Sequence, residues 1–170
     1  ASARSSPYFH NLGLEVLDER PFEIEPRTAA TSSCTDLGLK YPAKVDPLST
    51  GQLLADSFGA AVTGASESDS FDRLVLREGL HWRQVTVLRA YARYMRQMGN
   101  TNSFGFMADT LLANPRVTKG LNALFAARFD PSLGDDERAE AQASVRKDLD
   151  VSIEKVATLD ADRSCARSST

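Results

Sequence analysis

The sequence predicts a mainly α-helical protein with a minor β portion. Its 170 residues are 42% hydrophobic, which is enough to bury a core. A strand-like pattern occurs only near the N-terminus. Helical spacing of apolar residues, separated by short connectors rich in Gly, Asn, Pro and Asp, runs through the remainder. We therefore expect a β-hairpin plus one helix, followed by a bundle of about five helices.

The predicted hairpin has a first strand over residues 14–25, broken between Arg20 and Pro21, and a second strand over residues 34–41. A polar connector, residues 26–33, joins the two strands. We expect the acidic pair before Arg20 to lie in a tight turn, where consecutive carboxylates diverge and the arginine supplies a counter-charge. The pair is therefore predicted to be structural and not an acid–base pair.

The helix after the hairpin is predicted from apolar residues at helical spacing, and it ends at Gly64. A small polar connector, residues 64–70, follows it. We place a domain boundary here, with a partial α+β piece over residues 1–64 and a helical bundle domain over residues 65–170.

The helical part is predicted to contain five helices, over residues 71–77, 82–98, 103–113, 116–129 and 135–158. Because the connectors are short, neighbouring helices should pack antiparallel. The last helix is highly charged, and its narrow apolar stripe predicts that only one face is docked. The stripe comprises Val145, Leu149, Ile153 and Val156.

The helix over residues 82–98 is predicted to have two distinct faces. Its core face comprises Val85, Leu88, Ala92 and Met95. A second stripe carries Arg89, Arg93 and Arg96, which we interpret as a solvated face or an inter-domain contact. His81 precedes this helix, and Gln84 is placed to complete a capping box with it.

Composition argues against several classes of function. The net charge of −3, with both signs interspersed, does not favour nucleic acid or an anionic membrane as a partner. No apolar run is long enough to span a bilayer and the first residues lack a secretory signal, so we expect a cytoplasmic protein. Cys34 and Cys165 are interpreted as free thiols.

The sequence shows no motif for catalysis, metal binding or cofactor binding. There is no glycine-rich dinucleotide or phosphate loop, so NAD should not bind this chain in a Rossmann manner. His10 and His81 are the only histidines, and neither has the further ligands or the positioned carboxylate that metal or triad chemistry requires. We predict no catalytic, cofactor-binding or metal-binding residue.

Several longer motifs carry a family resemblance. They are LVLREGLHWRQVTVLRAYARYMRQMG (residues 74–99), NLGLEVLDERPFEI (11–24), DLGLKY (36–41), FMADTLLANPRVTKGLNALFAARFDP (106–131) and VATLDADR (156–163). In this order and spacing, the chain resembles the large bacterial NAD-specific glutamate dehydrogenases in the region just before their catalytic domain. The family often has a hydroxyl residue where this chain has His81.

The resemblance implies a regulatory and scaffolding segment of an enzyme that oxidatively deaminates L-glutamate to 2-oxoglutarate and ammonia with NAD. The parent's catalytic and NAD-binding residues lie in a later region, so this segment is catalytically silent and has no cofactor of its own. Its expected partners are the other domains and subunits of the parent.

The resemblance also implies that the first 64 residues form an incomplete ACT-like module, which lacks its first strand and most of its first helix. The open sheet edge predicts possible self-association. Since ACT modules bind small effectors near strand–helix junctions and subunit interfaces, the turn Asn11, Leu12 and Gly13 is the candidate effector or interface site.

Two other classes of function stay open. One is a stand-alone sensor of small ligands such as amino acids, or a protein-interaction domain. The other is a nucleic-acid-binding helical protein that uses the arginine-rich helix and its aromatic residues Trp82, Tyr91 and Tyr94. Aromatic residues at helical spacing are more often core than binding surface, which argues against the second class.

Overall fold

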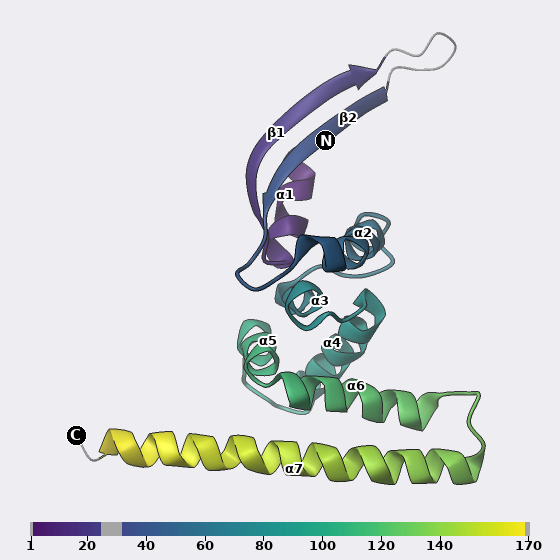
Figure 1. Cartoon of the computed structure of the whole chain (residues 1–170), viewed down its shortest axis with the longest axis vertical. Helices are drawn as coiled ribbons and strands as arrows, with labels where there is room; N and C mark the ends of the chain where they lie inside the picture. Colours follow the sequence, from purple (N-terminus) through teal and green to yellow (C-terminus); the bar gives the residue numbers. More distant parts are fainter. Residues whose placement is uncertain (1, 25–31, 169–170) are drawn as a thin grey trace. The chain divides into compact units, whose positions relative to one another are not determined.

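The computed structural model describes residues 2–24 and 32–168, and the side chains of residues 7–23 and 34–156. It is mainly α-helical with one two-stranded antiparallel hairpin, which confirms the predicted fold class (Figure 1). The elements are α1 (Ser2–Asn11), β1 (Glu15–Ile24), β2 (Ser32–Lys40), α2 (Pro47–Val62), the short 3-10 helix η1 (Ser70–Asp72), α3 (Arg73–Glu78), α4 (Trp82–Gln97), α5 (Phe104–Ala113), α6 (Pro115–Phe129) and α7 (Asp135–Ser168).

The chain divides into two compact units, Ala1–Ala108 and Asp109–Thr170, here called unit 1 and unit 2. Unit 1 contains the hairpin, the helices up to α4 and the first part of α5. Unit 2 contains the end of α5 together with α6 and α7. The predicted domain boundary after Gly64 falls within unit 1 and stays a prediction.

The core of unit 1 is centred on η1 and α3. Phe71, Leu74 and Val75 are fully buried, and Val85 of α4 is only 1% exposed. Burial of such side chains is worth about 1.5–3 kcal/mol each, so this cluster is the main source of stability in the unit.

Helix α1 was not predicted. Its sequence contains three serines and an internal proline, Pro7, which give little helical propensity. The helix is stabilised by tertiary contacts instead, because the ring of Phe9 stacks on Phe58 of α2 with 4.9 Å between centroids. A single apolar contact of this kind leaves no periodic pattern in so short a segment.

The hairpin continues through the position where a strand break was predicted. Its register runs from Glu15 opposite Lys40 to Ile24 opposite Ser32, with one irregularity between Val16 and Asp18. The acidic pair before Arg20 therefore lies in a strand, and the predicted tight turn is wrong. The predicted counter-charge is present, since Arg20 donates to Asp18 at 2.9 Å. Most of the predicted connector, residues 26–33, lies outside the described residues.

Three of the four predicted core positions of α4 are confirmed. Val85, Leu88 and Ala92 are at most 5% exposed, whereas Met95 is 48% exposed and its prediction is wrong. The fourth interior position belongs to Arg89, six residues before Met95, because the pattern i, i+3, i+4, i+7 from residue 85 selects it. Arg89 is thus buried and does not lie on an exposed flank.

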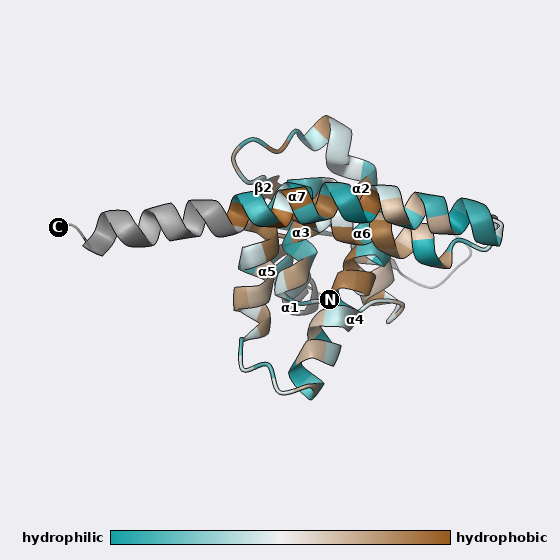
Figure 2. Cartoon of the chain, turned by 90° about the horizontal axis from the view of Figure 1, so that it is seen from below, coloured by the Kyte–Doolittle hydropathy of each residue, from teal (hydrophilic) through white to brown (hydrophobic). Residues whose placement is uncertain are grey.

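Unit 2 is built on the helical hairpin of α6 and α7, which run antiparallel as predicted (Figure 1). Leu149 is the buried residue of the predicted stripe, and it packs on Gly120, where an added Cβ would lie 2.9 Å from Leu149 Cδ1. Ile153, one turn after Leu149, is 46% exposed. The apolar stripe of α7 is therefore buried at Leu149 but largely open to solvent at Ile153. Hydrophilic residues cover most of the described length of α7 (Figure 2).

Helix α7 is longer than predicted and reaches Ser168 instead of residue 158. The prediction ended where the apolar stripe ends. No glycine or proline follows Gly134 in the chain, so no residue that breaks helices terminates it earlier.

Gly79 ends α3 in the left-handed conformation, with φ of +68°. The Gly79→Ala variant is expected to lose about 1–2 kcal/mol of stability, because a Cβ is strained in this conformation. A matched control is Gly51→Ala, in the interior of α2 and also with open space around the added Cβ, which should gain up to about 1 kcal/mol. Urea unfolding, followed by the fluorescence of Trp82, the single tryptophan, measures the free energy of unfolding of both variants. A loss of stability in the Gly51 variant as large as that in the Gly79 variant would contradict this account.

Candidate functional site

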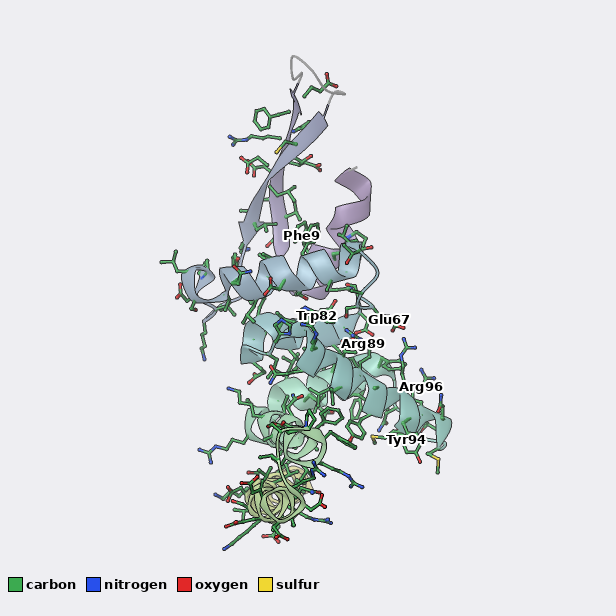
Figure 3. All side chains as sticks on the ribbon, turned by 90° about the vertical axis from the view of Figure 1, so that its right-hand side faces the viewer. Phe9, Glu67, Trp82, Arg89, Tyr94 and Arg96 are labelled. Carbon is green, nitrogen blue, oxygen red and sulfur yellow. The ribbon has the colours of Figure 1, made fainter. Side chains whose placement is uncertain are left out.

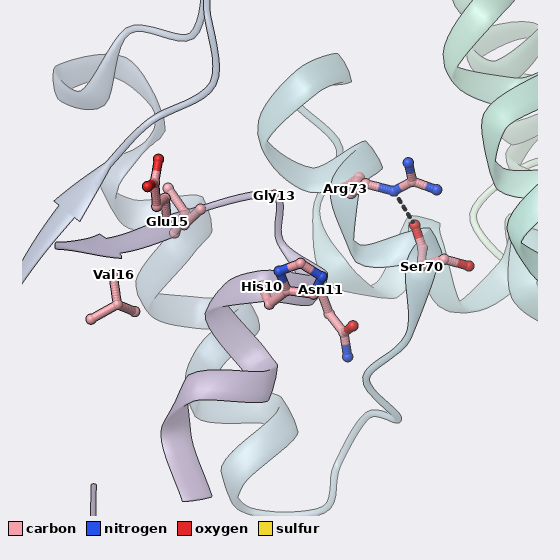
Figure 4. A pocket seen from close by; sticks show the side chains of 8 residues that line it. His10, Asn11, Gly13, Glu15, Val16, Ser70 and Arg73 are labelled. Carbon is pink, nitrogen blue, oxygen red and sulfur yellow. Dashed lines mark hydrogen bonds between the residues drawn. The ribbon is translucent and has the colours of Figure 1, made fainter. Parts of the chain in front are cut away.

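A pocket of about 640 Å³ lies in unit 1, where α1 ends and β1 begins, next to η1 and α3 (Figure 4). Its lining is partly charged and partly apolar. The lining residues are His10, Asn11, Gly13, Leu14, Glu15, Val16, Ser70 and Arg73. Two of the three residues predicted for effector binding, Asn11 and Gly13, therefore line a pocket.

The turn at the pocket is a helix C-cap built around Gly13, which has φ of +83°. The N–H of Gly13 donates to the carbonyl of His10, and that of Leu14 donates to the carbonyl of Phe9, both at 2.9 Å. This is the Schellman arrangement, which favours glycine at the left-handed position. Leu12 is 2% exposed and anchors the turn in the core, so it is not one of the pocket-lining residues.

Charged groups of both signs face the pocket. The Nε atom of Arg73 donates to the carbonyl of Ser70 at 3.1 Å, which holds the guanidinium at one side of the pocket (Figure 4). On the other side, Glu15 accepts a hydrogen bond from Lys40 at 2.8 Å. This bond and the charge of Glu15 raise the pKa of the Lys40 amine. The pocket thus offers a cation and a carboxylate at different positions.

A chain of hydrogen bonds leads from the pocket to α4. The side-chain amide of Asn11 donates to Ser68 Oγ at 3.0 Å, and Ser68 Oγ donates to Asp72 Oδ2 at 2.7 Å. The other oxygen of Asp72 accepts from Arg89 at 2.7 Å. These four residues, here called the relay, connect the end of α1 to the middle of α4.

Arg89 carries a buried positive charge at the end of the relay. It is 3% exposed, and it also donates through Nε to Asp69 at 2.9 Å, so two carboxylates balance it. Burial raises the pKa of Asp72, and the hydrogen bond from Ser68 and the charge of Arg89 partly offset that effect. A buried ion cluster of this kind holds its members in one geometry because any unpaired charge is costly.

The start of α4 is fixed by the predicted capping box. His81 Nδ1 accepts from the N–H of Arg83 at 3.3 Å, and the Gln84 side chain accepts from the N–H of His81 at 2.9 Å. The imidazole also lies 4.0 Å from the carboxylate of Asp56 in α2. His81 therefore has a structural role at the joint between α2 and α4.

The other two predicted arginines lie further along α4 and away from the pocket. Arg93 pairs with Glu67, and Arg96 lies over the ring of Phe104 at 5.3 Å. Arg96 and the neighbouring Tyr94, which is 59% exposed, are seen beyond Arg89 toward the end of the helix (Figure 3). The inter-domain role predicted for the three arginines stays a prediction; the described partners of Arg89 all lie within unit 1.

Sequence reasoning missed Ser68 and Asp69, because residues 64–70 were interpreted as a plain connector, and it missed Asp72 as a polar residue at the start of the predicted helix 71–77. A signal was present in the spacing, since Ser68 and Asp72 are four residues apart and Asp69 precedes an apolar turn as an N-cap residue. Arg73, which lines the pocket, was likewise not singled out.

The described residues were also compared with what a metal site, a free thiol and a membrane-spanning helix require. Within them, no three His, Cys, Asp or Glu side chains are grouped so that they could hold a metal ion. Cys34 is an exposed free thiol, and the side chain of Cys165 lies outside the described part. None of the described helices combines the length and the apolar character needed to cross a bilayer.

Two family models match the chain. The model of the glutamate dehydrogenase ACT3 domain matches residues 4–51, and that of glutamate dehydrogenase helical motif 3 matches residues 66–131. The pocket-lining turn falls in the first match, and the other relay residues fall in the second.

Individual relatives show the same similarity. The NAD-specific glutamate dehydrogenase of Halomonas elongata is 34% identical to this chain over an alignment that covers 80% of it. The enzymes of Pseudomonas aeruginosa and Mycobacterium tuberculosis are 32% and 31% identical, and each alignment covers 92% of the chain. The chain spans 9–10% of the length of these relatives. The chain belongs to the family of the large NAD-specific glutamate dehydrogenases, within which it matches the ACT3 domain and helical motif 3.

Proposed function

We propose that this chain is a regulatory and scaffolding segment of an NAD-specific glutamate dehydrogenase. The parent enzyme oxidatively deaminates L-glutamate to 2-oxoglutarate and ammonia with NAD, and other parts of the parent supply the catalytic groups and the NAD site. The segment itself performs no chemical step. Its partners are the other domains and subunits of that enzyme.

The observation that carries this proposal is the relay. It runs from Asn11, in the part that matches the ACT3 domain, to Arg89, in the part that matches helical motif 3. Regulation requires a free energy of coupling between two sites, and a continuous chain of hydrogen bonds, partly buried at Asn11 and Ser68 and buried at Asp72 and Arg89, is a physical route for it. A ligand that moves Asn11 alters the support of Asp72 and hence of α4.

The pocket suits a small zwitterion such as an amino acid. Arg73 is placed to bind a carboxylate, while Glu15 and the carbonyl end of α1 favour an ammonium group. The first test is a thermal-shift screen of the 170-residue chain with single L-amino acids. A ligand at about 100 times its Kd should stabilise unit 1 by about 2.7 kcal/mol.

The matched variants are Arg73→Met, which removes the pocket cation, and Arg77→Met, which changes an exposed arginine one turn later on α3. We expect the first to abolish the ligand-induced shift and the second to retain it. Equal shifts in both variants, with Trp82 fluorescence showing intact folding, would place the ligand elsewhere.

Coupling is tested in the parent enzyme with Ser68→Ala, which interrupts the relay. We expect basal kcat to be unchanged and the response of activity to the amino acid to disappear. Thr86→Ala, which removes an exposed hydroxyl of α4 whose hydrogen bonds among the described residues are to the carbonyl of Trp82 and to Ser66, is the control. A full response in the Ser68 variant contradicts the regulatory role.

The pocket also favours a second candidate, a stand-alone sensor of small ligands or a protein-interaction domain. The pocket is built entirely from unit 1, so it does not require the rest of a large enzyme. Amino-acid binding by the isolated chain, combined with an unchanged response in the parent variant, favours this candidate.

A further inference from the structure

The two ring nitrogens of His81 face different helices of unit 1. Nδ1 accepts a hydrogen bond from the N–H of Arg83 at 3.3 Å and so caps the start of α4, whereas Nε2 faces Oδ2 of Asp56 in α2 at 4.0 Å. The side chain of His81 is 35% exposed, so protons from the solvent can reach it. The charge of this imidazole therefore bears on how α2 and α4 are joined.

The cap on α4 requires a neutral imidazole. A neutral ring has one nitrogen that donates and one that accepts, whereas in the charged ring both nitrogens donate. Because Nδ1 accepts from Arg83, the proton of the neutral ring is on Nε2, which faces Asp56. A second proton must bind Nδ1, where it removes the lone pair that makes the cap. Protonation of His81 and capping of α4 by its ring thus exclude each other.

The start of α4 also repels a positive charge. The N-terminus of a helix is the positive end of its dipole, where a cation is unfavourable. The first turn of α4 contains no acidic residue to offset this effect. The guanidinium of Arg83 adds a second positive charge close by, over the ring of Trp82 at 4.4 Å. A charged imidazole is therefore driven away from α4.

Asp56 is placed to receive the charged imidazole. Its Oδ1 accepts from the side-chain amide of Gln52 at 2.8 Å, which holds the carboxylate on α2 while Oδ2 faces the ring. The separation of 4.0 Å is too long for a hydrogen bond, so this contact is still open while the cap on α4 is made. Helix α3 adds Arg77 and Glu78 in its last turn, and among the described residues neither pairs with the imidazole.

We propose that His81 is a pH-sensitive joint between α2 and α4. The neutral imidazole caps α4, and the imidazole that has taken a proton from water leaves Arg83 and pairs with Asp56. Histidine is the side chain that ordinarily changes charge between about pH 5 and 8, so mild acidification operates the joint. Gln84 still accepts from the backbone N–H of His81 in both forms, so the start of α4 is loosened and not lost. The joint is independent of the pocket and of the proposed regulation.

The release of the cap is tested by nuclear magnetic resonance on the 170-residue chain. The amide proton of Arg83 should shift upfield between about pH 8 and about pH 5, because it loses its hydrogen bond to the ring. His81→Asn keeps an acceptor at the cap but does not titrate, so its Arg83 resonance should stay in place. His10→Asn removes the other histidine of the chain and should respond as the wild type does.

The transfer to Asp56 is tested in the same titration. The carboxyl carbon resonance of Asp56 should move together with the ring resonances of His81 in the wild type, and it should stay in place over this range in His81→Asn. At the alkaline end, the ring ¹⁵N shifts of His81 should show a protonated Nε2 and a bare Nδ1, as the cap requires.

Each half of the proposal can fail on its own. An Arg83 resonance that does not move in the wild type, or that moves equally in His81→Asn, overturns the release of the cap. An Asp56 signal that does not follow His81 overturns the exchange of partners, and a proton on Nδ1 at the alkaline end overturns both. Trp82 fluorescence checks that each variant is folded.

Discussion

Replacing Arg89 with methionine should destabilise unit 1 by about 3–5 kcal/mol, which is the cost of leaving a buried charge without its partner. The substitution leaves Asp72, which is 5% exposed, with a largely buried carboxylate that has lost its positive partner. It also removes the counter-charge of Asp69. The apolar stem of methionine fills similar space, so the loss is electrostatic more than steric. Urea unfolding followed by Trp82 fluorescence measures it, because this residue begins α4.

The matched control is Arg93→Met, one turn later on the same helix. Its ion pair with Glu67 is exposed, with half of each side chain in water, so its removal should cost no more than about 1 kcal/mol. Similar losses for the two variants would show that burial does not decide the strength of these pairs. The double variant Arg89→Met, Asp72→Leu should recover stability, since replacing a buried ion pair with apolar groups is often neutral or better.

Replacing Leu149 with alanine should destabilise the α6–α7 hairpin by about 2–5 kcal/mol. Leu149 is 6% exposed and packs on Gly120, which has no side chain with which to fill the cavity. Hydrogen exchange of α6 and α7 amides in the native state gives the loss directly, because it measures the opening of this unit.

Ile153→Ala is the control for this prediction, as it removes an aliphatic side chain of the same stripe that is 46% exposed. Its effect should be below about 1 kcal/mol, as for most exposed positions. An equal increase in exchange rates for the two variants would mean that α7 is not docked through Leu149.

The elements with clear periodicity and clear ends were predictable from the sequence. Helix α4 shows both, since its core face repeats at helical spacing and His81 with Gln84 marks its start. Helix α1 shows neither, and tertiary contacts such as the stacking of Phe9 on Phe58 stabilise it. The prediction of a strand break at Pro21 was wrong, because a strand tolerates proline where the proline nitrogen faces the outer edge of the sheet. Which edge the nitrogen faces depends on the register of the two strands, which the sequence does not reveal.

The candidate site was predictable only in part, through the family resemblance. The turn that contains Asn11 and Gly13 was predicted from the resemblance to ACT modules, and the structure shows that Gly13 adopts the left-handed conformation there. The relay was not predictable, because Ser68 is separated from Asn11 by 57 positions. Arg89 looked like part of an exposed arginine stripe, since a periodic pattern does not reveal that two carboxylates from another element will neutralise one member.

The length of α7 has a mechanical consequence. At 34 residues it extends about 51 Å, whereas the 15 residues of α6 extend only about 22 Å. More than half of α7 therefore runs beyond the helix with which it is paired. The two ends of α7 are therefore about 50 Å apart, farther than the width of a small domain.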